Sequence, residues 1–134
     1  MKVKCMFNMG KDLPLRTLEV GDLPSTEYQL RIGDEYVVYS ISIWNGAIYY
    51  LTKDKYMTLP SWYPADLFTV IDNLLPLEWY FSYHGFKENW KLNAIWGYKE
   101  IALDEKHYEG LIEREDTAIR IFLKRKQEIE ELYE

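Results

Sequence analysis

The sequence predicts an α+β protein in which a small, strongly bent antiparallel β-sheet is followed by two C-terminal helices. Short runs rich in Tyr, Val and Ile, separated by turn residues, fill residues 1–101, whereas residues 102–134 space their apolar residues as helices do. The length of 134 residues fits one domain over 1–134, with a β-rich body over 1–101 and a helical segment over 102–134.

The N-terminal third of the chain combines one strand with irregular structure. Apolar residues alternate with lysines at the start, which predicts a first strand over residues 2–8 rather than a secretion signal. Residues 9–34 are punctuated by glycine and proline, which predicts turns with a short extended piece around Tyr28–Ile32.

A β-hairpin is the strongest local signal. Asn45-Gly46 separates the runs Glu35–Trp44 and Ala47–Lys53, and it favours a type I′ turn because both central residues of that turn need positive φ. The two-residue loop fixes the register of the pairs. One face pairs Ile43 with Ile48, Ile41 with Tyr50 and Tyr39 with Thr52; the other pairs Ser42 with Tyr49 and Ser40 with Leu51. The first face is the more apolar, so we expect it to point at the core. The second face is mixed, and the alternative that another part of the chain covers it stays open.

The remaining elements are shorter. Two prolines predict a loop over Leu59–Pro64, and strands follow at Leu67–Ile71 and Leu77–Tyr83, with one or two more over Trp90–Ile101. Asp104 is a suitable N-cap for the first helix. The second helix restarts at residues 116–117, and Arg125 interrupts its apolar stripe. This count makes an SH3-like barrel, with helices over one open side, the first choice of architecture.

Aromatic residues are unusually dense in the middle of the chain. Between positions 36 and 98 there are 17 aromatics among 63 residues, and all five tryptophans lie in this stretch. A core of this size is not expected to hold them all, and exposed Trp and Tyr are common anchors of protein interfaces. The candidate binding residues are Trp44, Trp62, Tyr63, Trp79, Trp90 and His84. The alternative is that a small β-barrel uses these rings as its core and rim.

The net charge of the chain and its distribution favour some kinds of binding partner over others. The net charge is −6, and residues 100–134 carry 11 acidic and 6 basic side chains against 11 and 10 in residues 1–99. A net-negative surface disfavours nucleic acid and suits a basic protein partner, although a solvated acidic helix face would have the same composition. No apolar run approaches the length that spans a bilayer, so we expect no membrane contact and a cytoplasmic location.

Catalytic and cofactor motifs are not apparent. The glycines are scattered, the single Cys5 cannot build a multi-cysteine metal site, and the two histidines lack metal-ligand spacing, so we expect neither a metal nor a cofactor. His84 could act as a base if Glu78 or Glu88 came close, but the spacing does not require that. We therefore name no catalytic residue.

Two stretches of the chain carry a resemblance. The first reads Trp62-Tyr63-Pro64-x-x-Leu67-Phe68-x-Val70-x-Asp72, followed by Pro76 and Trp79. The second reads Gly97-Tyr98-Lys99-Glu100, followed by His107-Tyr108-x-x-Leu111-Ile112-Glu113. Together they resemble small bacterial proteins that are similar to the immunity proteins of polymorphic-toxin systems. The resemblance implies stoichiometric inhibition of a cognate toxin, in which an acidic, aromatic surface covers a basic active site.

The sequence therefore supports three hypotheses for the function. The first is a non-catalytic, cytoplasmic protein-binding module, in its most concrete form an immunity protein. The second is a small hydrolase or ligand-binding enzyme that uses His84 and a nearby carboxylate. The third is a structural accessory subunit held by the C-terminal helix.

Overall fold

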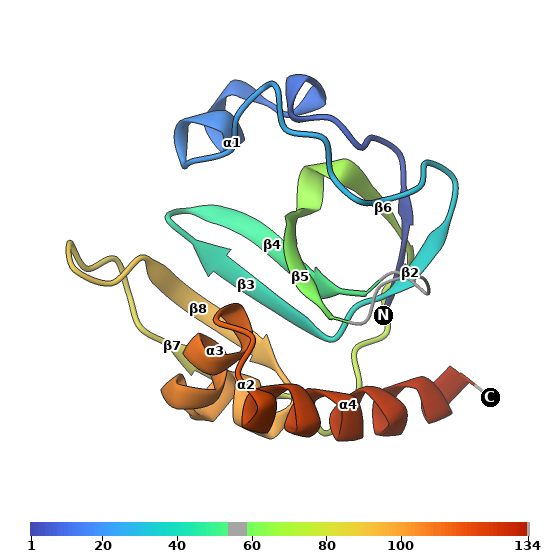
Figure 1. The fold of residues 1–134 in the computed structure, drawn as a ribbon, viewed down its shortest axis with the longest axis vertical. Helices are drawn as coiled ribbons and strands as arrows, with labels where there is room; N and C mark the ends of the chain where they lie inside the picture. Colours follow the sequence, from blue (N-terminus) through green and yellow to red (C-terminus); the bar gives the residue numbers. More distant parts are fainter. Residues whose placement is uncertain (54–58, 134) are drawn as a thin grey trace.

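The α+β class is confirmed, and the strands form two antiparallel sheets. The computed structural model describes residues 1–53 and 59–133 of the chain. A three-stranded sheet has the order β2-β1-β6, and a five-stranded sheet has the order β5-β4-β3-β8-β7 (Figure 1). Over the described ranges the strands form two open sheets and do not close into a barrel, so the SH3-like barrel expected from the sequence was wrong. The strands are β1 (Lys2–Cys5), β2 (Glu35–Val37), β3 (Ser40–Trp44), β4 (Ala47–Thr52), β5 (Ser61–Pro64), β6 (Phe68–Asp72), β7 (Tyr80–Tyr83) and β8 (Leu92–Gly97).

Helices flank the sheets at both ends of the chain. The α-helices are α1 (Leu15–Glu19), α2 (Lys99–Leu103), α3 (Glu105–Ile112) and α4 (Asp116–Glu130), and the 3-10 turns are η1 (Gly10–Asp12), η2 (Ala65–Leu67) and η3 (Glu131–Tyr133). Figure 1 shows α2, α3 and α4 together on one side of the β3–β4 hairpin, with α1 and the three-stranded sheet on the other. The five-stranded sheet therefore has covered surface on both faces.

Two hydrophobic clusters correspond to these two faces. On the helical side, Leu51 and Ile95 of the sheet pack with Ile101, Leu111 and Phe122 of the helices. On the other side, side chains of β1, β2, β4 and β5 pack with η2. That second cluster is Met1, Val3, Cys5, Leu13, Leu30, Tyr36, Val38, Tyr50, Tyr63 and Leu67. Because apolar surface is buried on both sides, neither face of the hairpin is simply the solvent face.

The hairpin forms in the predicted register from Ser40 to Ile43, and both of its faces are covered: Tyr50 and Ile41 of the apolar face pack in the cluster around Val3, and Leu51 of the other face packs in the helical cluster. Asn45 and Gly46 have φ of 49° and 81°, as the turn requires. The pairs from Ser40–Leu51 to Ile43–Ile48 are as predicted. The serine face is nevertheless the more completely buried, with Ser40 at 0% exposure, whereas Ile48 on the apolar face is 48% exposed. Small hydroxyl side chains can be buried here because Ser40 donates a 2.7 Å hydrogen bond to the Trp96 carbonyl.

Several elements differ from the predictions. The run Glu35–Trp44 is divided between β2 and β3, which belong to different sheets, and α1 forms within residues 9–34, where turns were predicted. The segment predicted as a proline loop contains β5, which pairs with β4, since its prolines stand next to the strand or at its end. The strand predicted at 77–83 starts at Tyr80, because Trp79 N–H donates to the Pro76 carbonyl in a turn. The chain leaves β8 at Gly97 and forms α2, so the C-terminal segment holds three α-helices where two were predicted.

The helix signals near the C-terminus are confirmed. The Asp104 side chain accepts hydrogen bonds from the backbone N–H groups of Lys106 and His107, so it caps α3 as predicted. Helix α4 starts at Asp116 and buries Ala118, Phe122 and Ile129. Its apolar face is thus used within the chain.

Candidate functional site

Trp44 and Trp62 meet at an aromatic pocket on the helical side of the five-stranded sheet. The pocket has a volume of about 340 Å³. Its lining, which defines the aromatic pocket below, is Val20, Gly21, Asp22, Ser42, Trp44, Tyr49, Trp62, Tyr108 and Ile112. Strands β3, β4 and β5, helix α3 and the chain after α1 all contribute, so the site exists only in the assembled fold.

Strand alternation explains which rings reach the pocket. Successive side chains on a strand point to opposite faces, so Trp44 lies on the same side of β3 as Ser42. Tyr49 lies opposite Ser42 on β4. Trp62 lies opposite Leu51, whose side chain belongs to the helical cluster. The sheet thereby presents three aromatic rings to α3.

The rings are held in pairs. Trp44 and Tyr49 are T-shaped with centroids 6.1 Å apart, and Trp62 and Tyr108 are tilted with centroids 6.0 Å apart. Such edge and tilted contacts are favourable because a ring's positive edge meets the negative face of its neighbour. Lys91 Nζ lies 5.4 Å from the centroid of the Trp44 ring, so this indole already contacts one cation. Burial raises the pKa of Tyr108 to about 12, so its hydroxyl is neutral at physiological pH.

Asp22 is the only charged residue among the described residues that line the pocket. One carboxylate oxygen accepts a 2.7 Å hydrogen bond from Tyr49, and the other accepts a 2.6 Å bond from Tyr28. Burial first, and then the bond to Asp22, raises the pKa of both tyrosines, which keeps their hydroxyls protonated as donors. A carboxylate oxygen has more than one acceptor position. Asp22 is therefore fixed in place and still able to attract a cation.

The structure separates Tyr63 from this site. Tyr63 is adjacent to Trp62 on β5 and therefore points to the opposite face, where it is only 5% exposed. Its ring meets Tyr28 and Phe68 edge-on, with centroids 6.1 and 6.5 Å away. The expectation that Tyr63 is an exposed anchor was wrong, because it assumed a loop in which neighbouring side chains could both face outward.

Trp79, Trp90 and His84 lie elsewhere. Trp79 packs at the edge of the cluster around Val3, and Trp90 packs at the edge of the helical cluster. Each has a buried indole N–H that finds no partner within the described residues, as does Trp62. His84 contacts Trp90 with ring centroids 6.2 Å apart, and its backbone N–H donates to the Asn93 carbonyl. Within the residues that the structure describes, His84 has no ion pair with a carboxylate, so the geometry offers no base–carboxylate pair there.

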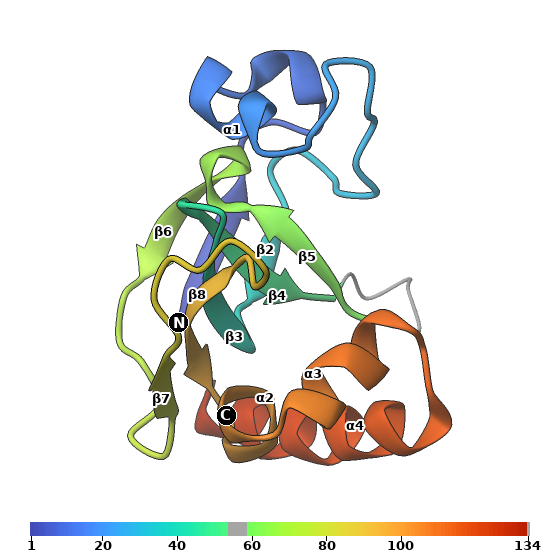
Figure 2. The same ribbon diagram turned by 90° about the vertical axis from the view of Figure 1, so that its left-hand side faces the viewer.

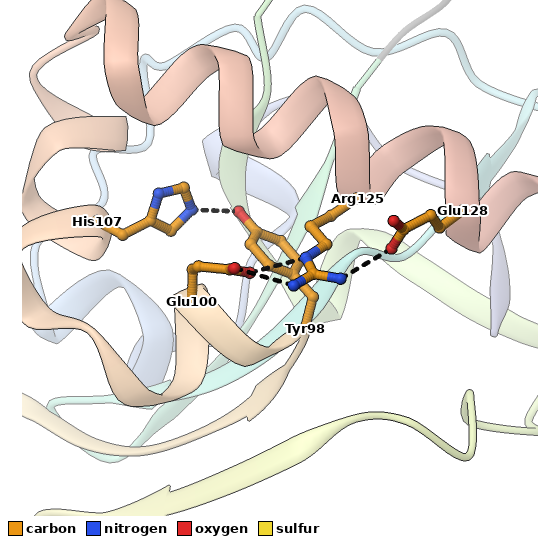
Figure 3. Close-up of polar contacts among 5 residues, drawn as sticks. All are labelled: Tyr98, Glu100, His107, Arg125 and Glu128. Carbon is orange, nitrogen blue, oxygen red and sulfur yellow. Dashed lines mark hydrogen bonds and ion pairs between the residues drawn. The ribbon is translucent and has the colours of Figure 1, made fainter.

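A polar cluster that sequence reasoning missed joins the three C-terminal helices (Figure 3). Tyr98 Oη lies 2.6 Å from His107 Nε2, and both residues are buried. Arg125 holds Glu100 through Nε and Nη2, at 2.8 and 2.9 Å, and also contacts Glu128. The hydrogen bonds from Arg125 lower the pKa of Glu100, and burial lowers the pKa of His107. The sequence showed that Arg125 interrupts an apolar stripe, which indicated a polar contact there. Its partner Glu100 lies 25 residues earlier, and no sequence spacing identifies it.

In the described ranges, no group of three or more His, Cys, Asp or Glu side chains is arranged to hold a metal ion. None of the helices described is long and apolar enough to cross a membrane. Tyr56, one of the 17 central aromatics, lies outside the described residues. Comparison of the chain with family models, curated proteins and solved structures gave no match in any of the three.

Proposed function

We propose that this protein is a non-catalytic protein-binding module whose aromatic pocket receives a lysine or arginine side chain of a basic partner. The observation that carries the proposal is the combination of four aromatic rings with the single carboxylate of Asp22 in one pocket. Aromatic faces attract cations, by about 2 kcal/mol or more where water is displaced. A carboxylate adds charge complementarity and a hydrogen-bond acceptor.

The size of the pocket supports a side chain as the occupant. A volume of about 340 Å³ stands at the lower end of the range of about 300–1,000 Å³ that small-molecule sites occupy. One long cationic side chain fits such a space. The selectivity of the pocket would then come from charge and ring geometry rather than from extensive contact.

Electrostatics of the whole chain support the same partner class. The net charge of −6 attracts a basic protein at long range and speeds its association. The same charge opposes binding to the phosphates of nucleic acids. An immunity protein that occludes a basic toxin site in the cytoplasm is the specific form of this proposal, and its support is the sequence resemblance together with this charge.

The experiment compares two variants that remove the same charge. Asp22→Asn keeps the shape of the pocket residue, whereas Glu19→Gln neutralises an exposed acid on α1 that does not line the pocket. Each variant and the wild-type protein would be used as bait in lysate of the source organism, and the affinity of any captured partner would be measured by calorimetry. We expect a basic partner whose dissociation constant rises about tenfold or more with Asp22→Asn and stays near the wild-type value with Glu19→Gln. Equal binding by both variants, or no partner for the folded wild type, would overturn the proposal.

Trp44→Ala gives a second test that is independent of charge. It removes one ring of the pocket from the end of β3, so we expect weaker binding of the same partner. Circular dichroism before the binding measurement establishes that the variant is folded. Unchanged affinity would show that Trp44 does not take part in recognition.

A further inference from the structure

The aromatic pocket contains two buried hydroxyl groups that the protein itself leaves without a partner. Ser42 of β3 and Tyr108 of α3 both line the pocket and are 2% and 9% exposed. Within the described residues, neither side chain takes part in a hydrogen bond. Neither hydroxyl oxygen is among the unpartnered polar atoms that are fully cut off from solvent, so a ligand in the pocket can reach both. Because buried hydroxyls are normally hydrogen-bonded, this pair indicates a ligand with hydrogen-bonding groups as well as a charge.

Asp22 adds a third, charged acceptor on a different wall of the pocket. It follows α1 in the chain, whereas Ser42 is on β3 and Tyr108 is on α3. Figure 2 shows α1 above β4 and β5 and α3 below them, so these acceptors reach the pocket from different sides. The carboxylate of Asp22 is held by the hydroxyls of Tyr28 and Tyr49 at 2.6 and 2.7 Å. A ligand that satisfies all three acceptors therefore needs several donors that point in different directions.

From this arrangement we infer that the pocket binds the guanidinium group of an arginine side chain in preference to the ammonium group of lysine. The inference rests on the proposed function, in which the pocket receives a cationic side chain of a partner. A guanidinium carries five N–H donors fanned out in a plane, whereas the three donors of an ammonium converge on one nitrogen. The fan donates to the Asp22 carboxylate and to the hydroxyls of Ser42 and Tyr108 together, and the bond to the carboxylate is charge-assisted.

The rings of the pocket favour the same group. A guanidinium is planar and more weakly hydrated than an ammonium, so it stacks on an aromatic face with a smaller loss of hydration. Indoles are the best rings for this contact, and Trp44 and Trp62 both line the pocket. Lys91 Nζ, which is not part of the lining, already lies 5.4 Å from the centroid of the Trp44 ring. The ring of Trp62, which pairs with Tyr108, is therefore the better place for a second cation.

The test compares short glycine–serine peptides that differ only in one central residue, which is arginine, lysine or trimethyllysine. Dissociation constants would be measured with the full chain by nuclear magnetic resonance titration. We expect the arginine peptide to bind about tenfold more tightly than the lysine peptide, because it makes one more hydrogen bond to a charged group. Trimethyllysine keeps the charge but has no N–H donor, so its contact relies on the rings alone. We expect it to bind most weakly.

Two variants remove the acceptors and keep the shape of the pocket. Tyr108→Phe removes the hydroxyl and retains the ring beside Trp62, and Ser42→Ala removes the other hydroxyl. Each should raise the dissociation constant of the arginine peptide about fivefold or more, and should change that of the trimethyllysine peptide little. Tyr80→Phe makes the same chemical change at an exposed residue of β7 outside the pocket, so it is the matched control. Circular dichroism establishes that each variant is folded.

The outcomes separate this inference from the proposed function. Equal affinity for the arginine and lysine peptides, weakened in both cases by Asp22→Asn, would overturn the preference for guanidinium and leave the cation pocket standing. The same holds if the trimethyllysine peptide binds most tightly. A preference for arginine that Tyr108→Phe and Ser42→Ala leave unchanged would overturn the role of the two hydroxyls. Binding of none of the peptides at millimolar concentrations would overturn both proposals.

Discussion

Truncation of Phe122 tests how the C-terminal helix is attached to the sheet. Phe122 on α4 is 0% exposed, and its ring lies edge-on to Tyr39 at 5.3 Å and tilted to Tyr98 at 6.5 Å. Replacing a buried phenylalanine by alanine loses transfer free energy and leaves a cavity, and it typically destabilises a protein by about 3–5 kcal/mol. A domain of this length has a total stability of about 7–20 kcal/mol at ~0.05–0.15 kcal/mol per residue. We therefore expect Phe122→Ala to fold with a clearly lower free energy of unfolding.

The adjacent residue supplies the control. Leu123 is 45% exposed on the same helix, so Leu123→Ala removes a similar apolar volume with little loss of packing. Urea unfolding followed by circular dichroism measures both variants, and an unchanged dependence on urea concentration shows that the unfolding transition is comparable. A loss below about 1 kcal/mol for Phe122→Ala, or equal losses for the two variants, would refute the packing of α4 described above.

Three further perturbations probe the region where β8 meets the helices. A methyl group at Gly97 would lie 2.6 Å from Ile101 Cγ2 and 2.7 Å from Ser40 Oγ. Gly97→Ala should therefore lower the free energy of unfolding, measured by urea titration, by about 1–3 kcal/mol. Adding Ile101→Val to this variant should recover part of the lost stability. Burial lowers the pKa of His107, so below the ordinary histidine value the unfolded chain binds more protons than the folded one. The free energy of unfolding should therefore fall as pH drops below about 6.5. In thermal unfolding, His107→Gln should remove this part of the pH dependence. Arg125 lowers the pKa of Glu100, so the ion pair stabilises the fold above the ordinary carboxyl value and is lost as pH falls through the lowered one. A double-mutant cycle with Glu100→Gln and Arg125→Met at pH 7 should give a coupling free energy of about 1 kcal/mol. A coupling free energy of zero would show that the contact contributes nothing to stability.

Local signals in the sequence predicted the elements that depend on local physics. The Asn45-Gly46 turn fixed the hairpin register because φ at two residues decides it, and Asp104 capped a helix because a side-chain acceptor is needed there. The more buried face of the hairpin could not be predicted in the same way. It depends on Ser40 donating a hydrogen bond to the Trp96 carbonyl, a contact that requires β8 to lie beside β3.

The candidate site was predicted only in part, for a related reason. Trp44 and Trp62 were identified as binding residues from aromatic density alone. Asp22 and Tyr108 were not, because they come from chain segments 86 residues apart that only the assembled fold brings to one pocket. Tyr63 was misassigned because two prolines beside it suggested a loop. The segment is instead a strand, β5, because it pairs with β4.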